Sequence, residues 1–288
     1  MTAARSPSLA RYVDRWAPDP VTAEDDLAPT FANRLAATLD IDHLFNAGDQ
    51  LPLLWHWVYF TEWASASSLG DDGHPRSGAF LPPIPNRRRM FGGGRVAVSM
   101  PLVLGTPTVR QSSIAAVTPR LGRSGELLFV TVRHQYIQNG TTAVVEEQDI
   151  VYRSDAGAAS NHSRCSVPLG ESAGEWSIRP VTNAPLLFQF SALTANAHRI
   201  HYDAPYATTV EGYPGLVVHG PLLAIYMAEV PRRHLGGETI KHFEFKLTRA
   251  VFVEDPIDVQ GTREGDDITL GVVGGGNAVH ASARAVLA

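Results

Sequence analysis

A short segment in the second half of the chain carries the residue types that acid–base chemistry requires. Asn196, His198 and His201 lie close together in the run NAHRIHYDAPYA. Histidine changes its protonation state near neutral pH, so it can take a proton from water or give one to a substrate. The segment therefore predicts a proton-transfer site, and the elements around it should position these side chains.

The sequence after this segment predicts a helix that begins at His219-Gly220-Pro221. Proline suits the first turn of a helix, because the N–H that it lacks would have no partner there. Apolar residues follow at the spacing of one buried helical face, namely Leu222, Leu223, Tyr226, Met227 and Val230. The free N–H groups and the dipole at a helix start favour negative charge. The pattern thus places a histidine-bearing loop near an anion-stabilising helix end.

The composition is that of a globular protein with a full core. The chain has 288 residues, of which 44% are hydrophobic and 18% are charged. A formal net charge of −5 argues against nucleic acid as a partner. The single cysteine, Cys165, excludes an internal disulfide framework and fits a reducing compartment. The sequence has neither a membrane-spanning apolar run nor the apolar core of a secretory signal, so we expect a cytoplasmic protein without membrane contact.

The first half of the chain predicts helices, then a long loop, then strands. Short helices are expected over residues 8–17 and from a start near residues 22–25. Leu27, Phe31, Leu35 and Leu39 would form the buried side of the second helix. An irregular segment is expected over residues 71–95 and four strands over residues 96–153. Asn139-Gly140 predicts a tight hairpin between the last two of these strands.

The second half repeats this order of elements. Residues 186–194 predict a strand, after which come the histidine loop, the helix and a β-rich tail. We divide the chain into an N-terminal half with a helical extension (residues 1–155), a linker (156–180) and a catalytic C-terminal half (181–288). The order predicts an α+β fold in which a bent antiparallel sheet wraps round a central helix twice. The first helix should be degenerate, because residues 71–95 are rich in proline and glycine.

Two motifs resemble a known family. NAHRIHYDAPYA followed by GLVVHGPLLA is similar to the hydration motif of the MaoC-like hot-dog family of enoyl-thioester hydratases. In the first half, LGDDGHPRSGAFLPPIPNRRRMFGGGR, RSGELLFVTV and EEQDIVYR resemble a narrower branch. That branch comprises the hydroxyacyl-thioester dehydratases type 2 and the mesaconyl-CoA and itaconyl-CoA hydratases. The resemblance implies a double hot-dog fold with its active site in the C-terminal half.

The resemblance also implies roles for single residues. His201 falls on the catalytic histidine of the family, and Gly220 on the glycine whose N–H stabilises the enolate oxygen. The aspartate of the family falls on Asn196, which can position a water but cannot accept a proton. The asparagine position of the family is His198 here. His201 would therefore carry more of the base work.

The implied activity is the reversible addition of water to an α,β-unsaturated CoA thioester. The branch indicates mesaconyl-CoA or itaconyl-CoA as substrate and citramalyl-CoA as product, with coenzyme A as part of the substrate and no further cofactor. A substrate carboxylate would require an arginine, because a charge-assisted pair offsets the loss of its hydration. Arg199, Arg88 and Arg89 are the candidates, and His198 is a further candidate for substrate binding.

Other functions also fit the residues. The chain could dehydrate straight-chain 3-hydroxyacyl thioesters, or it could bind an acyl thioester without turnover, which Asn196 favours. A thioesterase would need a carboxylate near the central helix, and Glu229 lies about two turns in. The spacing of histidines and Cys165 predicts no metal site. Sheet edges left uncovered by the fold predict a homodimer or a higher homo-oligomer.

Several of these residues also have a purely structural interpretation. His219 would serve packing, and Asp203 would cap a helix over residues 204–210. Asp72-Gly73-His74-Pro75 predicts a tight turn rather than a second acid–base pair. The run of arginines at 87–89 is typical of a solvated turn, and the glycines at 92–94 of a flexible one.

Overall fold

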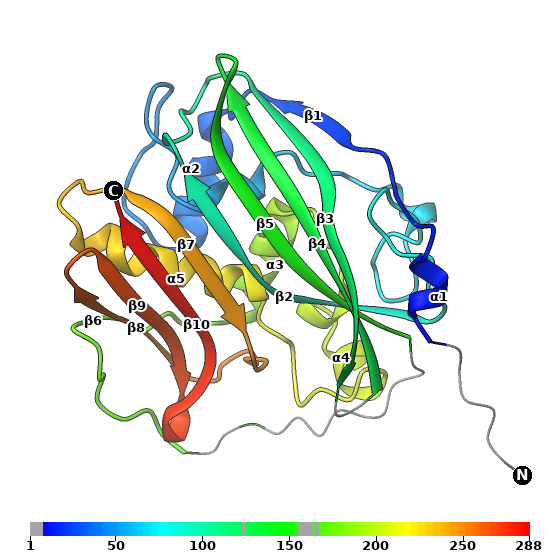
Figure 1. Cartoon of the computed structure of the whole chain (residues 1–288). Coiled ribbons are helices and arrows are strands. Elements are labelled where there is room, and N and C mark those ends of the chain that lie inside the picture. The colour runs from blue at the N-terminus through cyan, green and yellow to red at the C-terminus, as the bar shows by residue number, and fades with distance from the viewer. Residues whose placement is uncertain (1–7, 123–124, 155–163, 165–166) are drawn as a thin grey trace, which may run out of the picture.

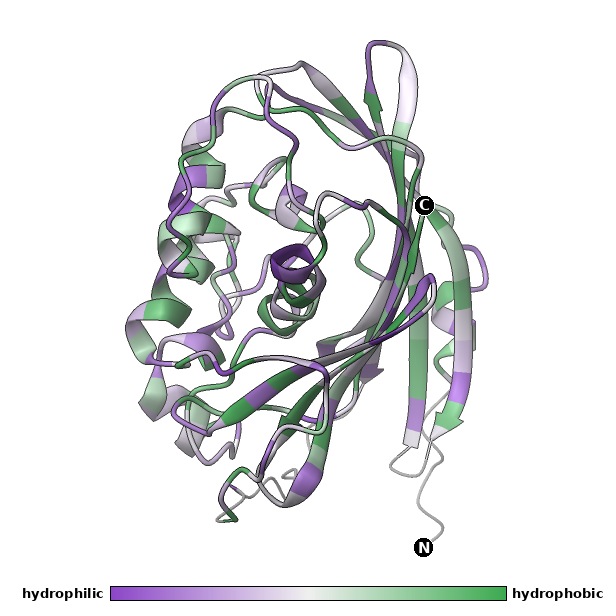
Figure 2. Cartoon of the chain, turned by 90° about the vertical axis from the view of Figure 1, so that its left-hand side faces the viewer, coloured by the Kyte–Doolittle hydropathy of each residue, from purple (hydrophilic) through white to green (hydrophobic). Residues whose placement is uncertain are grey.

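Ten antiparallel strands form a single sheet, and the longer helices lie on one side of it (Figures 1 and 2). A computed structural model describes residues 8–122, 125–154, 164 and 167–288 of the chain. Cys165, on which the prediction of a reducing compartment rests, lies outside these residues. No helix within the described ranges has both the length and the apolar character needed to cross a membrane.

The first half of the chain supplies five long or edge strands to this sheet. They are β1 (Val21–Asp25), β2 (Arg87–Val98), β3 (Thr108–Gly122), β4 (Gly125–Gln138) and β5 (Thr141–Ser154). Asn139 and Gly140 have φ angles of 50° and 76° and connect β4 to β5. Two consecutive positive φ angles match the twist of a two-residue hairpin, so the predicted hairpin is confirmed.

The second half supplies the other five strands and the central helix. The strands are β6 (Trp176–Ile178), β7 (Ile240–Leu247), β8 (Ile257–Glu264), β9 (Asp267–Gly274) and β10 (Ala278–Leu287). The order across the sheet is β1-β3-β4-β5-β2-β7-β10-β9-β8-β6. Helix α5 (Gly220–His234) packs against β6, β8, β9 and β10, and every residue from Leu222 to Pro231 is buried. The predicted start and burial of this helix are confirmed.

The remaining helices are shorter. The α-helices are α1 (Ala10–Val13), α2 (Pro29–Thr38), α3 (Ala184–Leu193) and α4 (Ala204–Thr209), and 3-10 turns occur at Trp55–Val58, Ala66–Ser68, Arg199–His201 and Gly275–Asn277. In the first half, the loop residues Phe80, Leu81 and Ile84 pack, together with α1, against apolar side chains of β4 and β5. A loop thus covers these strands where a central helix covers the second half, as the prediction of a degenerate first helix requires.

Strand β2 joins the two halves. It pairs with β5 along its length and with β7 from Gly93 to Ala97. A bulge lies between Phe91 and Gly93, and a Cβ at Gly93 would overlap the carbonyl oxygen of Phe245. The prediction that residues 87–89 and 92–94 form turns is therefore wrong. The glycines are strand residues that allow β7 to approach closely.

The strand predicted over residues 186–194 is also wrong, because this segment forms α3. Asn183 caps the helix by accepting a hydrogen bond from the Leu186 N–H at 2.9 Å, and Pro185 lies in its first turn. Leu187, Phe190 and Ser191 are buried on one helical face. A short apolar run does not by itself distinguish a buried helix from a buried strand, and the cap decides here.

Two smaller differences concern residues 22–25 and the segment 156–180. Residues 22–25 belong to β1 rather than to a helix start, and α2 begins only at Pro29. Of the four residues expected to be buried, Leu27, Leu35 and Leu39 are buried, whereas Phe31 is half-buried. The segment 156–180 contains β6, which pairs with β8, while residues 155–163 and 165–166 lie outside the described part.

Removing a side chain from the face of α5 should destabilise the fold strongly. Leu222 is completely buried, so we expect Leu222→Ala to lower the free energy of unfolding by about 2–5 kcal/mol, through lost burial and a cavity. Leu121, which is 84% exposed, provides the matched control. Leu121→Ala should change the value by no more than about 0.5 kcal/mol. Urea denaturation followed by circular dichroism measures both, and equal losses would contradict the burial assigned to α5.

Candidate active site

His201 is a buried, neutral imidazole, and one of its ring nitrogens has no hydrogen-bond partner among the described residues. It lies at the end of the 3-10 turn Arg199–His201, between α3 and α4, and is 7% exposed. Its Nδ1 lies 2.7 Å from the carbonyl oxygen of Val217, so Nδ1 carries the proton and Nε2 is left as an acceptor. Burial lowers the pKa of His201 to about 4, although the hydrogen bond to Val217 opposes this shift. At neutral pH, the side chain can therefore accept a proton.

His219 connects this imidazole to the start of α5. The rings of His201 and His219 are stacked, with centroids 3.7 Å apart and planes inclined by 18°. His219 Nε2 lies 2.8 Å from the Ser191 hydroxyl oxygen, and burial lowers the pKa of His219 well below its usual value. The completely buried ring thus acts as a fixed support for His201.

Gly220 is the first residue of α5 and directly follows His219, whose ring is stacked on that of His201. A Cβ at position 220 would run into the side chain of Leu247 and lie 3.8 Å from the ring of Phe91. A larger residue at this position would force the Leu247 side chain to move. The first N–H groups of a helix have no partner within the helix, so they are available to an anionic oxygen. The structure brings His201 together with the helix start, as the sequence predicted.

Asn196 and His198 shape the loop that leads to His201. The Asn196 side-chain oxygen accepts a hydrogen bond from the His198 N–H at 3.0 Å. The His198 ring lies 5.5 Å from that of His201, at 90° to it. Burial lowers the pKa of His198 to about 2, and the neighbouring His74 and His201 lower it further.

The three candidate arginines occupy different environments. Arg199 donates to the Asp203 carboxylate at 2.7 and 2.9 Å and to the Asp71 carbonyl oxygen at 2.9 Å, and its guanidinium lies 4.0 Å from the centre of the Tyr206 ring. Arg88 pairs with Glu211 at 3.4 Å.

Arg89 differs from both, because it has no hydrogen-bond or ion-pair partner among the residues that the structure describes. Its charge nevertheless lowers the pKa of His198, so it lies near the histidine loop. The Asp203 side chain also accepts from the Tyr206 N–H at 3.0 Å, which confirms the predicted cap of α4.

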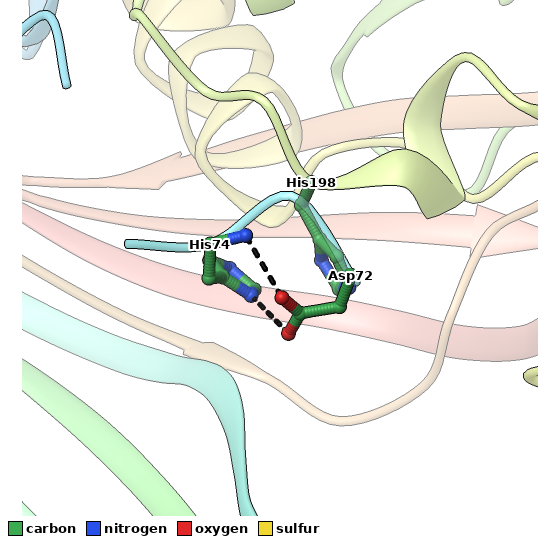
Figure 3. Close-up of side chains that lie close together, drawn as sticks. All are labelled: Asp72, His74 and His198. Atoms are coloured by element: carbon green, nitrogen blue, oxygen red, sulfur yellow. Dashed lines mark hydrogen bonds and ion pairs between the residues drawn. The ribbon is translucent and has the colours of Figure 1, made fainter. Parts of the chain in front are cut away.

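A loop of the N-terminal half docks on this histidine loop (Figure 3). The Arg199 N–H donates to the Asp72 carbonyl oxygen at 2.9 Å. Gly73, with φ of 89°, lies so close to Ala197 that a Cβ would overlap the Ala197 carbonyl oxygen. The predicted turn is present but begins two residues earlier: the Gly73 N–H donates to the Gly70 carbonyl oxygen, and the His74 N–H donates to the Asp72 side chain, both at 2.9 Å.

This docking places a carboxylate and a fourth imidazole in the site. Asp72 accepts from the His74 backbone N–H and from His74 Nδ1, each at 2.9 Å. The rings of His74 and His198 lie 4.1 Å apart. Burial alone would raise the pKa of Asp72, but the hydrogen bonds from His74 lower it to about 2.

Asp72, His74 and His198 are also the residues that could hold a cation. One ligand atom from each lies within 4.8 Å of the others. The spacing along the sequence gave no metal signal, because the donors come from two loops more than a hundred residues apart. Two of the three donors are already joined by the hydrogen bond between Asp72 and His74.

A cavity of about 510 Å³ lies along β3, β4 and β5 and reaches Asp72 and His74 of this group, whereas His198, His201 and Gly220 do not line it. Its wall includes Asp72, His74, Arg89, Ser112, His134 and Ile150. Behind the wall, Glu146 is completely buried and lies 2.9 Å from His56 Nε2. Burial would raise the pKa of Glu146, but the charge and hydrogen bond of His56 lower it to about 2. This end of the cavity is therefore polar and rigidly held.

Known proteins resemble this chain along most of its length. Residues 54–253 match the profile of the hydroxyacyl-thioester dehydratase type 2 family. The chain is 43% identical to a mesaconyl-C(4)-CoA hydratase of Chloroflexus aurantiacus over 265 residues, which are 92% of this chain and 94% of that protein. The chain belongs to the hydroxyacyl-thioester dehydratase type 2 family. It is therefore a hydro-lyase of acyl thioesters, the enzyme class that the sequence predicted.

More distant relatives of this family member agree in sequence or in fold. A mitochondrial hydroxyacyl-thioester dehydratase type 2 of Schizosaccharomyces pombe is 27% identical over 233 residues, covering 71% of this chain and 75% of that protein. A MaoC-like dehydratase structure from Phytophthora capsici has a TM-score of 0.69 at 13% identity, covering 97% and 98% of the two chains. A Mycobacterium tuberculosis protein with a double hot-dog fold has a TM-score of 0.59 at 11% identity, with 98% of each chain covered. The predicted double hot-dog fold is thus confirmed.

The buried histidines of this dehydratase-family site should make the fold sensitive to acid. The unfolded chain protonates histidine near pH 6.5, whereas burial lowers the pKa of His201 and His134 to about 4. Between these values, the unfolded state binds more protons, so the free energy of unfolding should fall as the pH falls from about 7 to 4. Urea unfolding at several pH values measures the slope.

A pair of variants tests the origin of this slope. His201→Asn should reduce the pH dependence of stability, because one buried group that resists protonation is removed. His234→Asn, at an exposed position, should leave it unchanged. Equal slopes in the wild type and His201→Asn would contradict the assignment.

Proposed function

We propose that this chain hydrates a branched C5 dicarboxylic enoyl-CoA, mesaconyl-CoA or itaconyl-CoA, to citramalyl-CoA. The observation that carries the proposal is the buried, neutral His201 held beside the N-terminus of α5. The similarity to a mesaconyl-C(4)-CoA hydratase over 92% of the chain supports the choice of substrate.

The proposed reaction needs a base for water and a donor for the enolate. His201 Nε2 takes a proton from water while the water oxygen forms a bond to the β-carbon. Electron density moves to the thioester oxygen, which the N–H of Gly220 stabilises, and a donor in such a position is worth about 3–4 kcal/mol. Asn196 helps to position the water through its side-chain NH₂, because its oxygen is bonded to the His198 N–H.

Arg89 is the candidate that suits the carboxylate of the substrate. In a C4 thioester of mesaconate, the carboxylate is attached to the β-carbon, so its partner must lie near the histidines. Arg89 lines the cavity beside His74 and lacks a partner among the described residues. Arg199 and Arg88 already have carboxylate partners, Asp203 and Glu211. His198 would contribute its ring to the wall of the acyl site.

The other functions have less support. A dehydratase of straight-chain 3-hydroxyacyl thioesters would use the same groups, and it is the second candidate because relatives of that name match the chain. It would leave Arg89 unused. A thioesterase is disfavoured, because the Glu229 carboxylate is buried and bonded to Arg232 and to the Trp55 indole. Binding without turnover leaves unexplained why His201 has a free Nε2.

Loss of the His201 imidazole should abolish most of the activity. His201→Ala is expected to lower kcat for hydration by about 10²–10⁴, the usual contribution of acid–base catalysis. The decrease in enoyl-thioester absorbance on mixing with mesaconyl-CoA or crotonyl-CoA measures the rate. A matched control is His242→Ala, because His242 is an exposed residue of β7. Full activity in His201→Ala would remove His201 from the mechanism.

The choice of substrate rests on a ratio of kcat/KM values. A site built for the carboxylate should prefer mesaconyl-CoA to crotonyl-CoA by up to about 10⁴, because the arginine is unpaired with the monoacid. Arg89→Ala should lower kcat/KM for the diacid by about 2–5 kcal/mol in free-energy terms and change that for crotonyl-CoA little. Arg95→Gln is the control. Arg95 lies on β2 like Arg89, but it already pairs with Glu147 and Asp149 of β5. A ratio near one in the wild type would exclude the C5 substrate but not hydration.

A further inference from the structure

Hydration of an enoyl thioester requires two proton transfers. The loop from Asn196 to His201 supplies one group for them, His201. Water must lose a proton when its oxygen bonds to the β-carbon, and the α-carbon of the enolate must gain one. Asn196 cannot take part in either transfer, because an amide has no proton to exchange at neutral pH. A second group that can give and take a proton should therefore face the substrate.

The described residues offer a carboxylate–imidazole pair for this role, at the point where the two halves meet. His74 Nδ1 is 2.9 Å from the Asp72 carboxylate, so Nδ1 carries a proton and Nε2 is the nitrogen that can exchange one. Both residues belong to the wall of the cavity, and the side chain of His74 is 22% exposed. His74 is thus accessible from the cavity and fixed in orientation, as an acid–base residue must be.

The neighbouring groups fit the same role. His198 lies between His74 and His201, with ring centroids 4.1 Å from the first and 5.5 Å from the second. Figure 3 shows the Asp72 carboxylate bonded to the His74 backbone and ring nitrogens, with the His198 ring beside both residues. Among the described residues, the charged groups on the cavity wall with His74 are Asp72, Glu62, Arg76, Arg87, Arg89 and Arg110, and Asp72 is the one bonded to it. The His198 ring is half-buried, and burial together with the neighbouring imidazoles lowers its pKa to about 2, so His198 stays neutral beside the pair.

The docking of the two loops is specific enough to hold such a pair. The Arg199 backbone and side chain bind the carbonyl oxygens of Asp72 and Asp71, both at 2.9 Å. Gly73 lies against the Ala197 carbonyl oxygen, where any larger residue would push the loops apart. These contacts fix Asp72 and His74 relative to His201 across the boundary between the halves.

We propose that His74 is a second catalytic acid–base residue, positioned by Asp72, which transfers a proton to the α-carbon during hydration and removes it during dehydration. The inference rests on the hydratase function proposed above. In the forward direction, the water oxygen bonds to the β-carbon and its proton goes to His201 Nε2. The resulting enolate takes the proton of His74 Nε2, which forms the α-carbon–hydrogen bond. Solvent then restores the proton of His74 and accepts that of His201, so one water is consumed and both imidazoles are regenerated.

Adjacent aspartates provide a matched pair of variants. The Asp71 side chain is fully exposed, whereas that of Asp72 is bonded to His74. His74→Asn can keep the hydrogen bond to Asp72 but cannot transfer a proton, and it should lower kcat by about 10²–10⁴ with little change in KM. Asp72→Asn should lower kcat by a smaller factor and alter the pH dependence of kcat. Asp71→Asn should retain the wild-type rate and pH profile.

A second measurement separates a catalytic role from a structural one. In D₂O, the wild type should incorporate deuterium at the α-carbon of a 3-hydroxyacyl-CoA through reversible dehydration, which mass spectrometry detects. His74→Asn should lose this exchange while its circular dichroism spectrum and melting temperature match those of the wild type. Prior treatment with EDTA should leave the wild-type rate unchanged.

The possible failures can be told apart. A wild type that turns over none of mesaconyl-CoA, itaconyl-CoA and crotonyl-CoA would overturn the proposed function itself. An active wild type together with a folded His74→Asn that keeps its rate and α-exchange would overturn the role of His74 alone. Activity lost on chelation and restored by Zn²⁺ would also overturn it, since Asp72, His74 and His198 would then bind a metal.

Discussion

The pairing of β2 with strands from both halves is the constraint on which the site depends. Its hydrogen bonds to β5 and to β7 make one sheet from two. The glycines at 93 and 94 allow this, because a Cβ at either would overlap backbone atoms or the ring of Phe245. This pairing holds the two halves together, and the contacts of Arg199 and Gly73 then fix the loop of Asp72 and His74 relative to His201. The site is thus a property of the fused pair of halves.

The burial of several imidazoles follows from the same arrangement. His198, His201 and His219 lie in contact, and burial lowers the pKa of each. A row of neutral rings avoids the cost of buried charge, which would be large without a paired carboxylate. The only carboxylate in this group, Asp72, lies at its more exposed end, on His74. Charge is therefore confined to the side that faces the cavity.

The arginines show how the fold distributes positive charge. Arg199, the arginine closest in sequence to His201, holds the loop together through Asp203 and the Asp71 carbonyl oxygen. Arg89 comes from β2, and it is the one that the cavity wall exposes without a described partner. Arg89 is exposed at its position in β2, so a bound carboxylate would gain from it through a direct charge-assisted pair rather than through a low dielectric.

The sequence determined the features that depend on local chemistry. It predicted the start of α5, the Asn139-Gly140 hairpin, the cap at Asp203 and the turn at residues 72–75, because each is set by a few adjacent residues. The motif around His201 also indicated the family and the fold. Where short-range signals were ambiguous, as in the apolar run of α3, the prediction of a strand was wrong.

Only the tertiary structure decided which distant residues share the site. Asp72 and His74 lie more than a hundred residues before His198, and nothing in their own spacing indicates that they meet it. Their position depends on the β2 pairing and on the close approach of Gly73 to Ala197. Likewise, Arg199 is paired with Asp203, whereas Arg89 has no ion-pair partner among the described residues. Which of the two is paired depends on the other elements that pack around each. Contacts of this kind are fixed by the packing of whole halves, which local sequence patterns do not encode.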